Sequence, residues 1–323
     1  MSQKNWKNFC IVGSGNHAIT KVIPALIAEN KYIKGIVSSK KKNILLEFKK
    51  FNNIKDSLIN LPKDTVFVIA SPPDMHFKQA REIIKYGRDV IIEKPSFICV
   101  KEVEEICSLV NSNKNIILEG FMHRYTKLYI DFMRYWIKEK HEIVVLKSSF
   151  YVPEIPKGSF RDNKDIISSC LYDMGCYGLS LLNDMGLDLN EIKINTFNIH
   201  ESRISSVQLK GIIDNISIEI KFGNNKNYEN FVEVITKNNK ITRFFPFFYG
   251  RKAMKFIKHF KNNDIQFEQF DDCNAFQLMF NENRHNLFLN QKIRLNKILV
   301  VTKKLESLAK ELETLKVKNN YIK

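Results

Sequence analysis

The sequence predicts an α/β protein of two domains: a doubly wound parallel sheet, then an α+β domain with a large open, mainly antiparallel sheet. Strands and helices alternate through the first third of the chain, which is the pattern of a doubly wound sheet. The run 66–70 is continuously apolar, as in a central parallel strand covered on both faces. Beyond residue 121, longer segments of period-two character indicate antiparallel strands.

The predicted elements divide the chain into a first domain at 1–121 and a second domain at 122–323. In the first domain, strands are predicted at 9–12, 32–37, 66–70, 89–92 and 115–118, and helices at 18–29, 44–51, 76–86 and 100–113. In the second, helices are predicted at 129–140, 172–185 and 293–316, and strands at 143–151, 192–200, 205–212, 216–222 and 231–236. Helix 172–185 is expected to cover one sheet face. An apolar face left open usually finds a partner, so a homodimer or homotetramer is predicted.

Composition narrows the functional classes. The chain has 323 residues, of which 44% are hydrophobic, enough for a large core. Its net charge is +16, but the lysines are dispersed and no nucleic-acid motif accompanies them, so no nucleic-acid partner is predicted. The six cysteines include no Cys-x-x-Cys pair, so neither a metal site nor a disulfide framework is expected.

The sequence also bears on location. No apolar run approaches the roughly 18 residues of a membrane span, and the N-terminus has no hydrophobic signal core. These features predict a cytoplasmic protein with no membrane partner.

The first strand runs directly into a glycine turn and a helix. Gly13 and Gly15 let the backbone turn tightly and approach a ligand, while the helix start offers N–H groups and partial positive charge to a diphosphate. The sequence therefore predicts a dinucleotide-binding Rossmann domain, and a purely structural turn is the alternative. The predicted cofactor-binding residues of the turn are Gly13, Ser14, Gly15, Asn16, His17 and Ala18.

The end of the second strand bears on the choice of cofactor. A carboxylate there would accept hydrogen bonds from the ribose hydroxyls of NAD. The chain has Ser38, Ser39 and Lys40 instead, followed by two more lysines. Hydroxyls and cations suit a 2′-phosphate, so NADP(H) is favoured, with NAD(H) possible. The alternative is that the lysines belong to a solvated loop.

Glu93, Lys94 and Pro95 directly follow the apolar strand 89–92. In a parallel sheet, ligands bind beyond the carboxyl ends of the strands, where this sequence lies. Proline fixes the backbone next to the lysine. The pattern therefore predicts a lysine aimed at a ligand rather than one on a solvated helix face.

Four ordered motifs resemble the glucose–fructose oxidoreductase/inositol dehydrogenase (Gfo/Idh/MocA) family of NAD(P)-dependent oxidoreductases. They are the glycine turn with its helix, the sequence ASPPDMH at 70–76, the Glu-Lys-Pro sequence, and LYDMGCY at 171–177, which is similar to the family's Asp-x-Gly-x-Tyr or His motif. The resemblance covers residues 9–185, and the final helix also fits. It implies further cofactor contacts from Ala70, Ser71, Pro72, Pro73, His76, Glu93, Lys94, Arg124 and Arg161. Each of the two arginines has the alternative of being an ordinary surface residue.

The resemblance also implies the catalytic residues Lys94, Tyr177 and Asp173. In the family, the lysine of Glu-Lys-Pro reaches the substrate and the nicotinamide ribose. Asp173 and Tyr177 are four residues apart, which places them on one face of a helix. Tyr177 would exchange a proton with the reacting sugar oxygen, and a nearby ammonium would favour its phenolate. Asp173 would bind a substrate hydroxyl or keep Lys94 charged.

The loop 152–161 is similar to that of a subgroup that includes NADPH-dependent reductases of nucleotide-linked 3-keto sugars, and Tyr177 fits this subgroup. The resemblance therefore favours reduction of a keto sugar. Ser39 stands where NADP users typically have arginine, and 168–170 replaces a glycine run, so cofactor choice and pocket shape stay open. The alternatives are oxidation of a sugar or polyol and a non-catalytic dinucleotide sensor.

Overall fold

The computed structural model describes residues 6–38, 48–113, 115–153, 155, 157–224, 227–261, 264–282 and 284–318. The chain forms two compact units. One consists of residues 1–121 and 276–302, and the other of residues 122–275 and 303–323. Residues 276–302 pack with the first unit although they follow the second in sequence, because Leu295 and Ile298 belong to the same hydrophobic cluster as Phe97.

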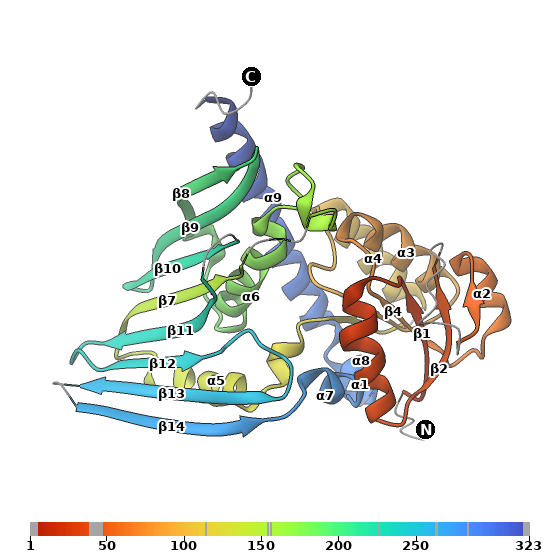
Figure 1. Cartoon of the computed structure of the whole chain (residues 1–323), viewed down its shortest axis with the longest axis horizontal. Coiled ribbons are helices and arrows are strands. Elements are labelled where there is room, and N and C mark those ends of the chain that lie inside the picture. The colour runs from red at the N-terminus through yellow and green to blue at the C-terminus, as the bar shows by residue number, and fades with distance from the viewer. Residues whose placement is uncertain are drawn as a thin grey trace. The chain divides into compact units, whose positions relative to one another are not determined.

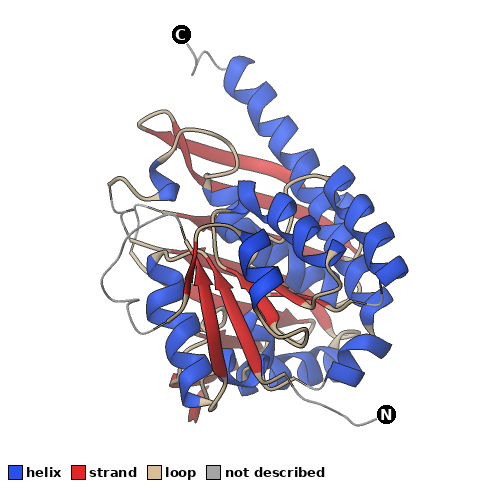
Figure 2. Cartoon of the chain, turned by 90° about the vertical axis from the view of Figure 1, so that its right-hand side faces the viewer, coloured by secondary structure: helices blue, strands red, loops and turns tan. Residues whose placement is uncertain are grey.

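The first unit contains a parallel sheet of six strands with helices on both faces (Figure 2). This confirms the doubly wound fold. The strand order is β3 (Lys50–Phe51), β2 (Tyr32–Val37), β1 (Asn8–Val12), β4 (Val66–Ile69), β5 (Val90–Ile92) and β6 (Ile117–Glu119). The helices that follow these strands are η1 and α1 (Ala18–Val22 and Ile23–Ala28), α2 (Ile54–Asn60), α3 (Pro73–Lys85) and α4 (Val100–Asn113).

Both faces of this sheet are buried, which explains its continuous apolar strands. Cys10 and Val12 of β1 face a cluster built from α2, α3, α4 and α9 (Gln291–Lys318). The ring of Phe9 meets Phe280 of α7 (Ala275–Phe280) edge to face at 5.9 Å. The short helix α8 (Arg284–Leu289) connects α7 to α9.

One predicted element of the first unit, the helix at 44–51, is wrong at its end. Lys50 and Phe51 form strand β3, in which Phe51 pairs with Val37. Residues 44–47 lie outside the described residues. A side chain on Gly35 would come within 2.5 Å of the Phe51 ring, so this glycine makes room for the ring. The helix α2 that follows was not predicted. Asn53 caps its start by accepting a hydrogen bond from the Asp56 N–H at 2.8 Å.

The second unit contains the large open sheet at the left of Figure 1, in which β8 and β14 form the two edges. Seven neighbouring pairs form its ladder, and all are antiparallel except β7 with β10. This confirms the predicted mainly antiparallel sheet. Its order is β14 (Asp264–Asp272), β13 (Ala253–Lys261), β12 (Ile241–Phe245), β11 (Glu229–Thr236), β7 (Ile143–Tyr151), β10 (Ile216–Gly223), β9 (Arg203–Ile213) and β8 (Lys193–His200).

Helices cover one face of this sheet, as predicted. Helix α5 (Lys127–Glu139) packs near β12, where Phe132 meets Phe244 edge to face at 5.2 Å. The η5–α6 helix (Leu171–Gly175 continuing as Cys176–Asp184) packs on β10. Strands β12, β13 and β14 were not predicted. Among the residues that the structure describes, no helix has the length and apolar character needed to cross a membrane.

Candidate active site

The glycine turn lies where three strands end. Gly13 follows β1 with φ +105°, a conformation that favours glycine, and its N–H donates to the Val37 carbonyl of β2 at 2.9 Å. A Cβ at position 13 would lie 3.0 Å from the Ala70 carbonyl oxygen, just beyond β4. The turn is therefore packed against the ends of β2 and β4. At Gly15, by contrast, a Cβ would meet no atom of the described residues within 4 Å.

This arrangement fits a bound diphosphate. The strand order reverses at β1 and β4, and such a switch point is where doubly wound sheets bind ligands. The open space at Gly15 adjoins the start of the helix, whose Ala18 is fully buried. Ser14 and Ser38 share a hydrogen bond of 2.6 Å between their hydroxyls. Ser39 and Lys40, on which the NADP prediction partly depends, lie outside the described residues.

A histidine–carboxylate contact joins the glycine turn to the Glu-Lys-Pro sequence. His17 Nε2 lies 2.8 Å from Glu93 Oε1. Burial would raise the pKa of Glu93, but His17, Lys94 and His76 outweigh it, so this pKa is lowered. Glu93 is therefore a buried carboxylate at neutral pH. Because β5 lies two strands from β1, this contact brings together two motifs that are 80 residues apart in sequence.

Lys94 follows β5 at the carboxyl edge of the sheet and is half-buried, and its peptide bond to Pro95 is cis. His76 of α3 is fully buried beside this loop, with Nδ1 3.0 Å from the Pro95 carbonyl oxygen. Its Nε2 lies 2.9 Å from the Ser71 carbonyl oxygen. Helix α3 begins at Pro73, with Pro72 as its N-cap residue, so both prolines lie between Ser71 and His76 in the sequence.

The second unit presents the Asp-x-Gly-x-Tyr residues on the η5–α6 helix. Asp173 accepts two charged hydrogen bonds from Arg161, from Nε at 2.8 Å and from Nη2 at 3.0 Å. Asp173 raises the pKa of Arg161, and burial opposes this rise. The structure thus pairs two residues that the sequence had assigned separately, one to the substrate and one to the cofactor.

Tyr177 lies in an aromatic cage with only 4% of its surface exposed. Its ring centroid is 5.1 Å from that of His123, 5.2 Å from Phe150 and 5.4 Å from Phe248. Its hydroxyl lies 3.9 Å from Met122 Sδ. The cage fixes the ring by packing, and its members come from three distant stretches of chain.

Two glycines let this helix lie close to the sheet. A Cβ at Gly175 would approach the Phe222 ring to 2.7 Å, and one at Gly178 would approach Ile220 Cγ2 to 2.6 Å. Both contacted residues belong to β10. The glycine of Asp-x-Gly-x-Tyr therefore has a packing role, which sets the depth at which Tyr177 is buried.

Arg124 is mostly buried and ion-paired. Its Nε donates to Asp184 Oδ2 at 2.8 Å, and the Tyr129 hydroxyl donates to the same oxygen at 2.5 Å. Burial raises the pKa of Tyr129, and Asp184 raises it further. Arg124 is thus held within the second unit and is not an ordinary surface arginine.

The sequence missed several residues of these two groups. Gln79 of α3 accepts a hydrogen bond from the Ser71 hydroxyl at 2.6 Å. Glu119 accepts one from the Ser96 hydroxyl at 2.8 Å, which ties the lysine loop to β6. Phe150 and Phe248 flank Tyr177. Glu119 directly follows the predicted strand 115–118 and could have been suspected from that position, but the other three carry no local sequence signal.

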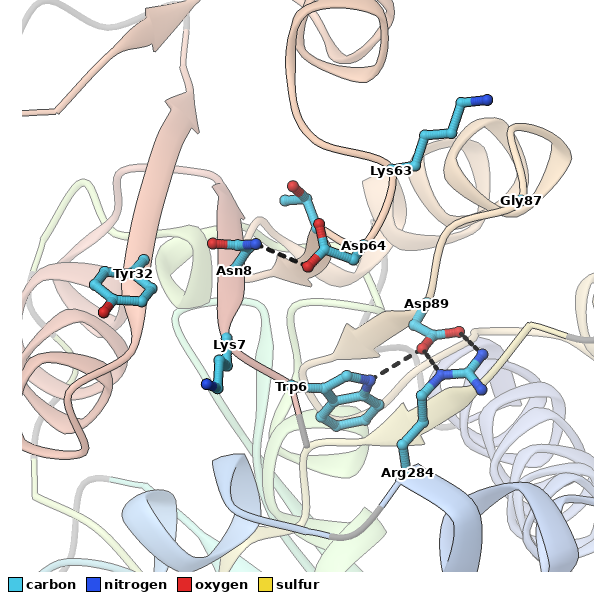
Figure 3. A pocket seen from close by; sticks show the side chains of 10 residues that line it. Trp6, Lys7, Asn8, Tyr32, Lys63, Asp64, Gly87, Asp89 and Arg284 are labelled. Carbon is cyan, nitrogen blue, oxygen red and sulfur yellow. Dashed lines mark hydrogen bonds and ion pairs between the residues drawn. The ribbon is translucent and has the colours of Figure 1, made fainter. Parts of the chain in front are cut away.

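A cavity of about 590 Å³ lies at the opposite, amino edge of the parallel sheet (Figure 3). Asp89 on its wall accepts hydrogen bonds from Trp6 at 3.0 Å and from Arg284 at 2.6 Å. Asn8 donates to Asp64 at 2.8 Å. None of the predicted site residues that the structure describes lines this cavity, so it is distinct from the candidate active site.

Comparison with protein families identifies the first part of the chain. Residues 7–121 match the model of the oxidoreductase family with an NAD-binding Rossmann fold (GFO_IDH_MocA). These residues therefore form a Rossmann domain of that oxidoreductase family. This confirms the predicted family resemblance over residues 7–121, which contain three of the four motifs.

Individual relatives are more distant. The chain is 24% identical over 191 residues to dTDP-3,4-didehydro-2,6-dideoxy-alpha-D-glucose 3-reductase of Streptomyces antibioticus, covering 56% of this chain and 58% of the relative. It is 32% identical over 75 residues to an uncharacterized oxidoreductase of Synechocystis, covering 23% of this chain and 20% of the relative. The matches thus span less than two thirds of either curated relative.

Solved structures share the fold over nearly the whole chain. KijD10, a 3-ketoreductase from Actinomadura kijaniata in complex with NADP and TDP-benzene, superposes with a TM-score of 0.79 at 14% identity, covering 94% of this chain and 97% of that one. The aldose-aldose oxidoreductase from Caulobacter crescentus gives a TM-score of 0.76 at 12% identity, covering 94% and 96%. At these identities the likeness establishes the fold.

Proposed function

We propose that this protein is an NADPH-dependent oxidoreductase that reduces the carbonyl group of a nucleotide-linked keto sugar. The observation that carries the proposal is the contact between His17 and Glu93 at 2.8 Å, because it holds the Lys94 loop beside the glycine turn at the carboxyl edge of the sheet. The dTDP-sugar 3-reductase and the NADP-bound 3-ketoreductase among the similar proteins support both the substrate class and the cofactor.

The cofactor would be held mainly by backbone. The turn from Gly13 to Ala18 would bind the diphosphate, and Ser38 would lie near the adenosine ribose because it follows β2. Ala70 and Ser71 follow β4 at the same edge. When bound, the nicotinamide cofactor supplies the hydride.

The side chains would supply charge and a proton. The Lys94 ammonium would stabilise negative charge that develops on the substrate oxygen. The Tyr177 hydroxyl would donate the proton that this oxygen takes up. Asp173 would bind a substrate hydroxyl through the oxygen lone pairs that Arg161 does not occupy, since a carboxylate accepts about four hydrogen bonds. The aromatic cage would exclude water around Tyr177.

The test has two stages. Enhancement of cofactor fluorescence on binding should be stronger with NADPH than with NADH. The protein should then oxidise NADPH in the presence of a dTDP-linked keto sugar and not with free aldoses. Cofactor binding without turnover of any nucleotide-linked keto sugar would favour a sensor. Turnover only with NADP⁺ and a sugar or polyol would favour the oxidative direction.

We propose further that the protein is a homo-oligomer that associates through the open face of the large sheet. Phe245, Phe256 and Phe267 lie side by side there, with centroids 5.1 and 5.2 Å apart. Phe267 is 51% exposed and Ile265 is 56% exposed, and such apolar groups favour a covered interface. Light scattering should show a dimer or tetramer that Phe267→Lys weakens, and a monomer at micromolar concentration would contradict the proposal. The cytoplasmic location stays a prediction.

A further inference from the structure

His76 is a fully buried histidine whose two ring nitrogens face two different loops. Nε2 lies 2.9 Å from the carbonyl oxygen of Ser71, which follows β4. Nδ1 lies 3.0 Å from the carbonyl oxygen of Pro95, which follows β5. With 0% of its surface exposed, the ring has no room for a ligand of its own.

The two loops belong to different parts of the proposed reaction. The Ser71 loop packs against the glycine turn, since the Ala70 carbonyl limits the space at Gly13. The Pro95 carbonyl belongs to the residue directly after Lys94. The ring of His76 is therefore a bridge between the segment that would hold the cofactor and the segment that carries the reactive ammonium.

The pKa of His76 lies below its usual value because burial disfavours the charged ring, so the neutral imidazole is the favoured form at neutral pH. A neutral imidazole can donate to one of the two carbonyls, and an imidazolium can donate to both. Burial lowers the pKa of His76, whereas the two carbonyls and the Glu93 carboxylate act in the opposite direction. The neutral ring donates one hydrogen bond, to the Pro95 or the Ser71 carbonyl according to its tautomer, so the position of the ring is fixed by a polar contact and not by packing alone.

We propose that His76 is a positioning residue: it sets the aim of Lys94 by tying the Lys94 loop to the cofactor loop, and it contacts neither substrate nor cofactor. The inference deepens the proposed reductase function and rests on it. It differs from the direct cofactor contact that the family resemblance implies for His76. A displacement of about 1 Å in a catalytic group can cost roughly 100-fold in rate, so a loop contact of this kind is sufficient to control turnover.

Two amide substitutions separate the two contacts. In His76→Asn the side-chain NH₂ occupies the place of Nδ1 and keeps the contact with Pro95. In His76→Gln it occupies the place of Nε2 and keeps the contact with Ser71. Each variant retains one side-chain donor of similar reach and loses the other, so each variant is the matched control for the other. A thermal melt of both variants controls for a general loss of stability.

The two variants should fail in different ways. His76→Gln should bind NADPH as the wild type does but lose about 100-fold in kcat, because Lys94 is no longer held in place. His76→Asn should retain a kcat within about tenfold of wild type, while its NADPH dissociation constant rises. Equal losses of kcat and NADPH affinity in both variants would overturn the proposal, as would wild-type kinetics in both.

Hydrogen–deuterium exchange tests the bridge independently of turnover. Exchange should accelerate at 94–98 in His76→Gln and at 70–75 in His76→Asn, with the other segment unchanged in each. If the wild type reduces no keto sugar but this selective exchange is seen, the bridge stands and the reductase proposal falls. If the wild type is active but exchange rises equally in both segments of both variants, the positioning role is contradicted and the reductase proposal stands.

Discussion

The two units hold their proposed reactive groups by different physical means. Around Lys94, polar contacts dominate: Glu93 meets His17, and His76 meets two backbone carbonyls. Around Tyr177, ring packing dominates, with three aromatic neighbours at 5.1 to 5.4 Å. Polar contacts fail steeply when their geometry changes, whereas a packed ring responds to volume. Substitutions in the two regions should therefore have different signatures.

Loss of either reactive group should have the largest effect. We expect Lys94→Ala and Tyr177→Phe each to lower kcat by about 10³-fold, the range for a positioned proton donor or charge. Stopped-flow oxidation of NADPH measures this rate. Lys85→Ala and Tyr86→Phe, at the end of α3, are matched controls and should leave kcat unchanged. A loss of less than about tenfold in both site variants would exclude these roles.

A buried lysine in the second unit is an exception to this contrast between polar contacts and ring packing. Lys255 of β13 is 0% exposed and donates to the carbonyls of Pro246 and Tyr249 at 3.1 and 2.6 Å. The segment that it holds carries Phe248, which contacts Tyr177. Burial lowers the pKa of Lys255 from its ordinary 10.5 to about 8, although Asp272 and Cys273 act to raise it. The aromatic cage thus rests partly on a polar contact.

The pH dependence of stability tests this feature. Between pH 8 and 10.5, Lys255 is neutral in the folded protein and charged in the unfolded chain, so the wild type should gain stability as pH rises. Relative to Lys255→Met, this gain should approach about 3 kcal/mol, at about 1.4 kcal/mol per pKa unit. Urea unfolding at several pH values measures the difference. Lys258→Met, on the same strand, is the control, and its difference in stability from the wild type should not change with pH. If the difference for Lys255→Met is equally independent of pH, the assignment is contradicted.

The helix that carries Tyr177 should be sensitive to added volume. Gly175→Ala places a methyl group against the Phe222 ring and should lower the free energy of unfolding by about 1 to 3 kcal/mol. Phe222→Leu in the same chain should restore part of this loss, because the smaller side chain makes room. If the double variant is as unstable as the sum of the two single variants, direct contact is not the cause.

The glycine turn should respond to backbone geometry instead. Gly13→Ala forces a side chain into positive φ and should cost about 1 to 2 kcal/mol of stability. Gly15→Ala enters open space, so its stability should change by less than about 0.5 kcal/mol while its NADPH affinity falls. Thermal unfolding and cofactor titration separate the two effects. Equal destabilisation by both substitutions would show that the space at Gly15 is misjudged.

The sequence predicted most of the first region because its motifs are local. Parallel strands must end at a common edge, so Gly13, Ser38 and Lys94 could be grouped without coordinates. The contact of His17 with Glu93 follows from strand order, which spacing alone does not specify. The aromatic cage could not be predicted, since Phe248 lies far along the chain from Tyr177. Phe51 misled the helix prediction because a buried two-residue strand has no distinctive period.

The central proposal is that Lys94 and Tyr177 act on a single substrate carbonyl. A double-mutant cycle of Lys94→Ala and Tyr177→Phe, read by single-turnover oxidation of NADPH with a dTDP-linked keto sugar, tests it most directly. We predict a combined loss smaller than the product of the two single losses, with a coupling free energy of at least about 1 kcal/mol. Losses that multiply independently would contradict the account.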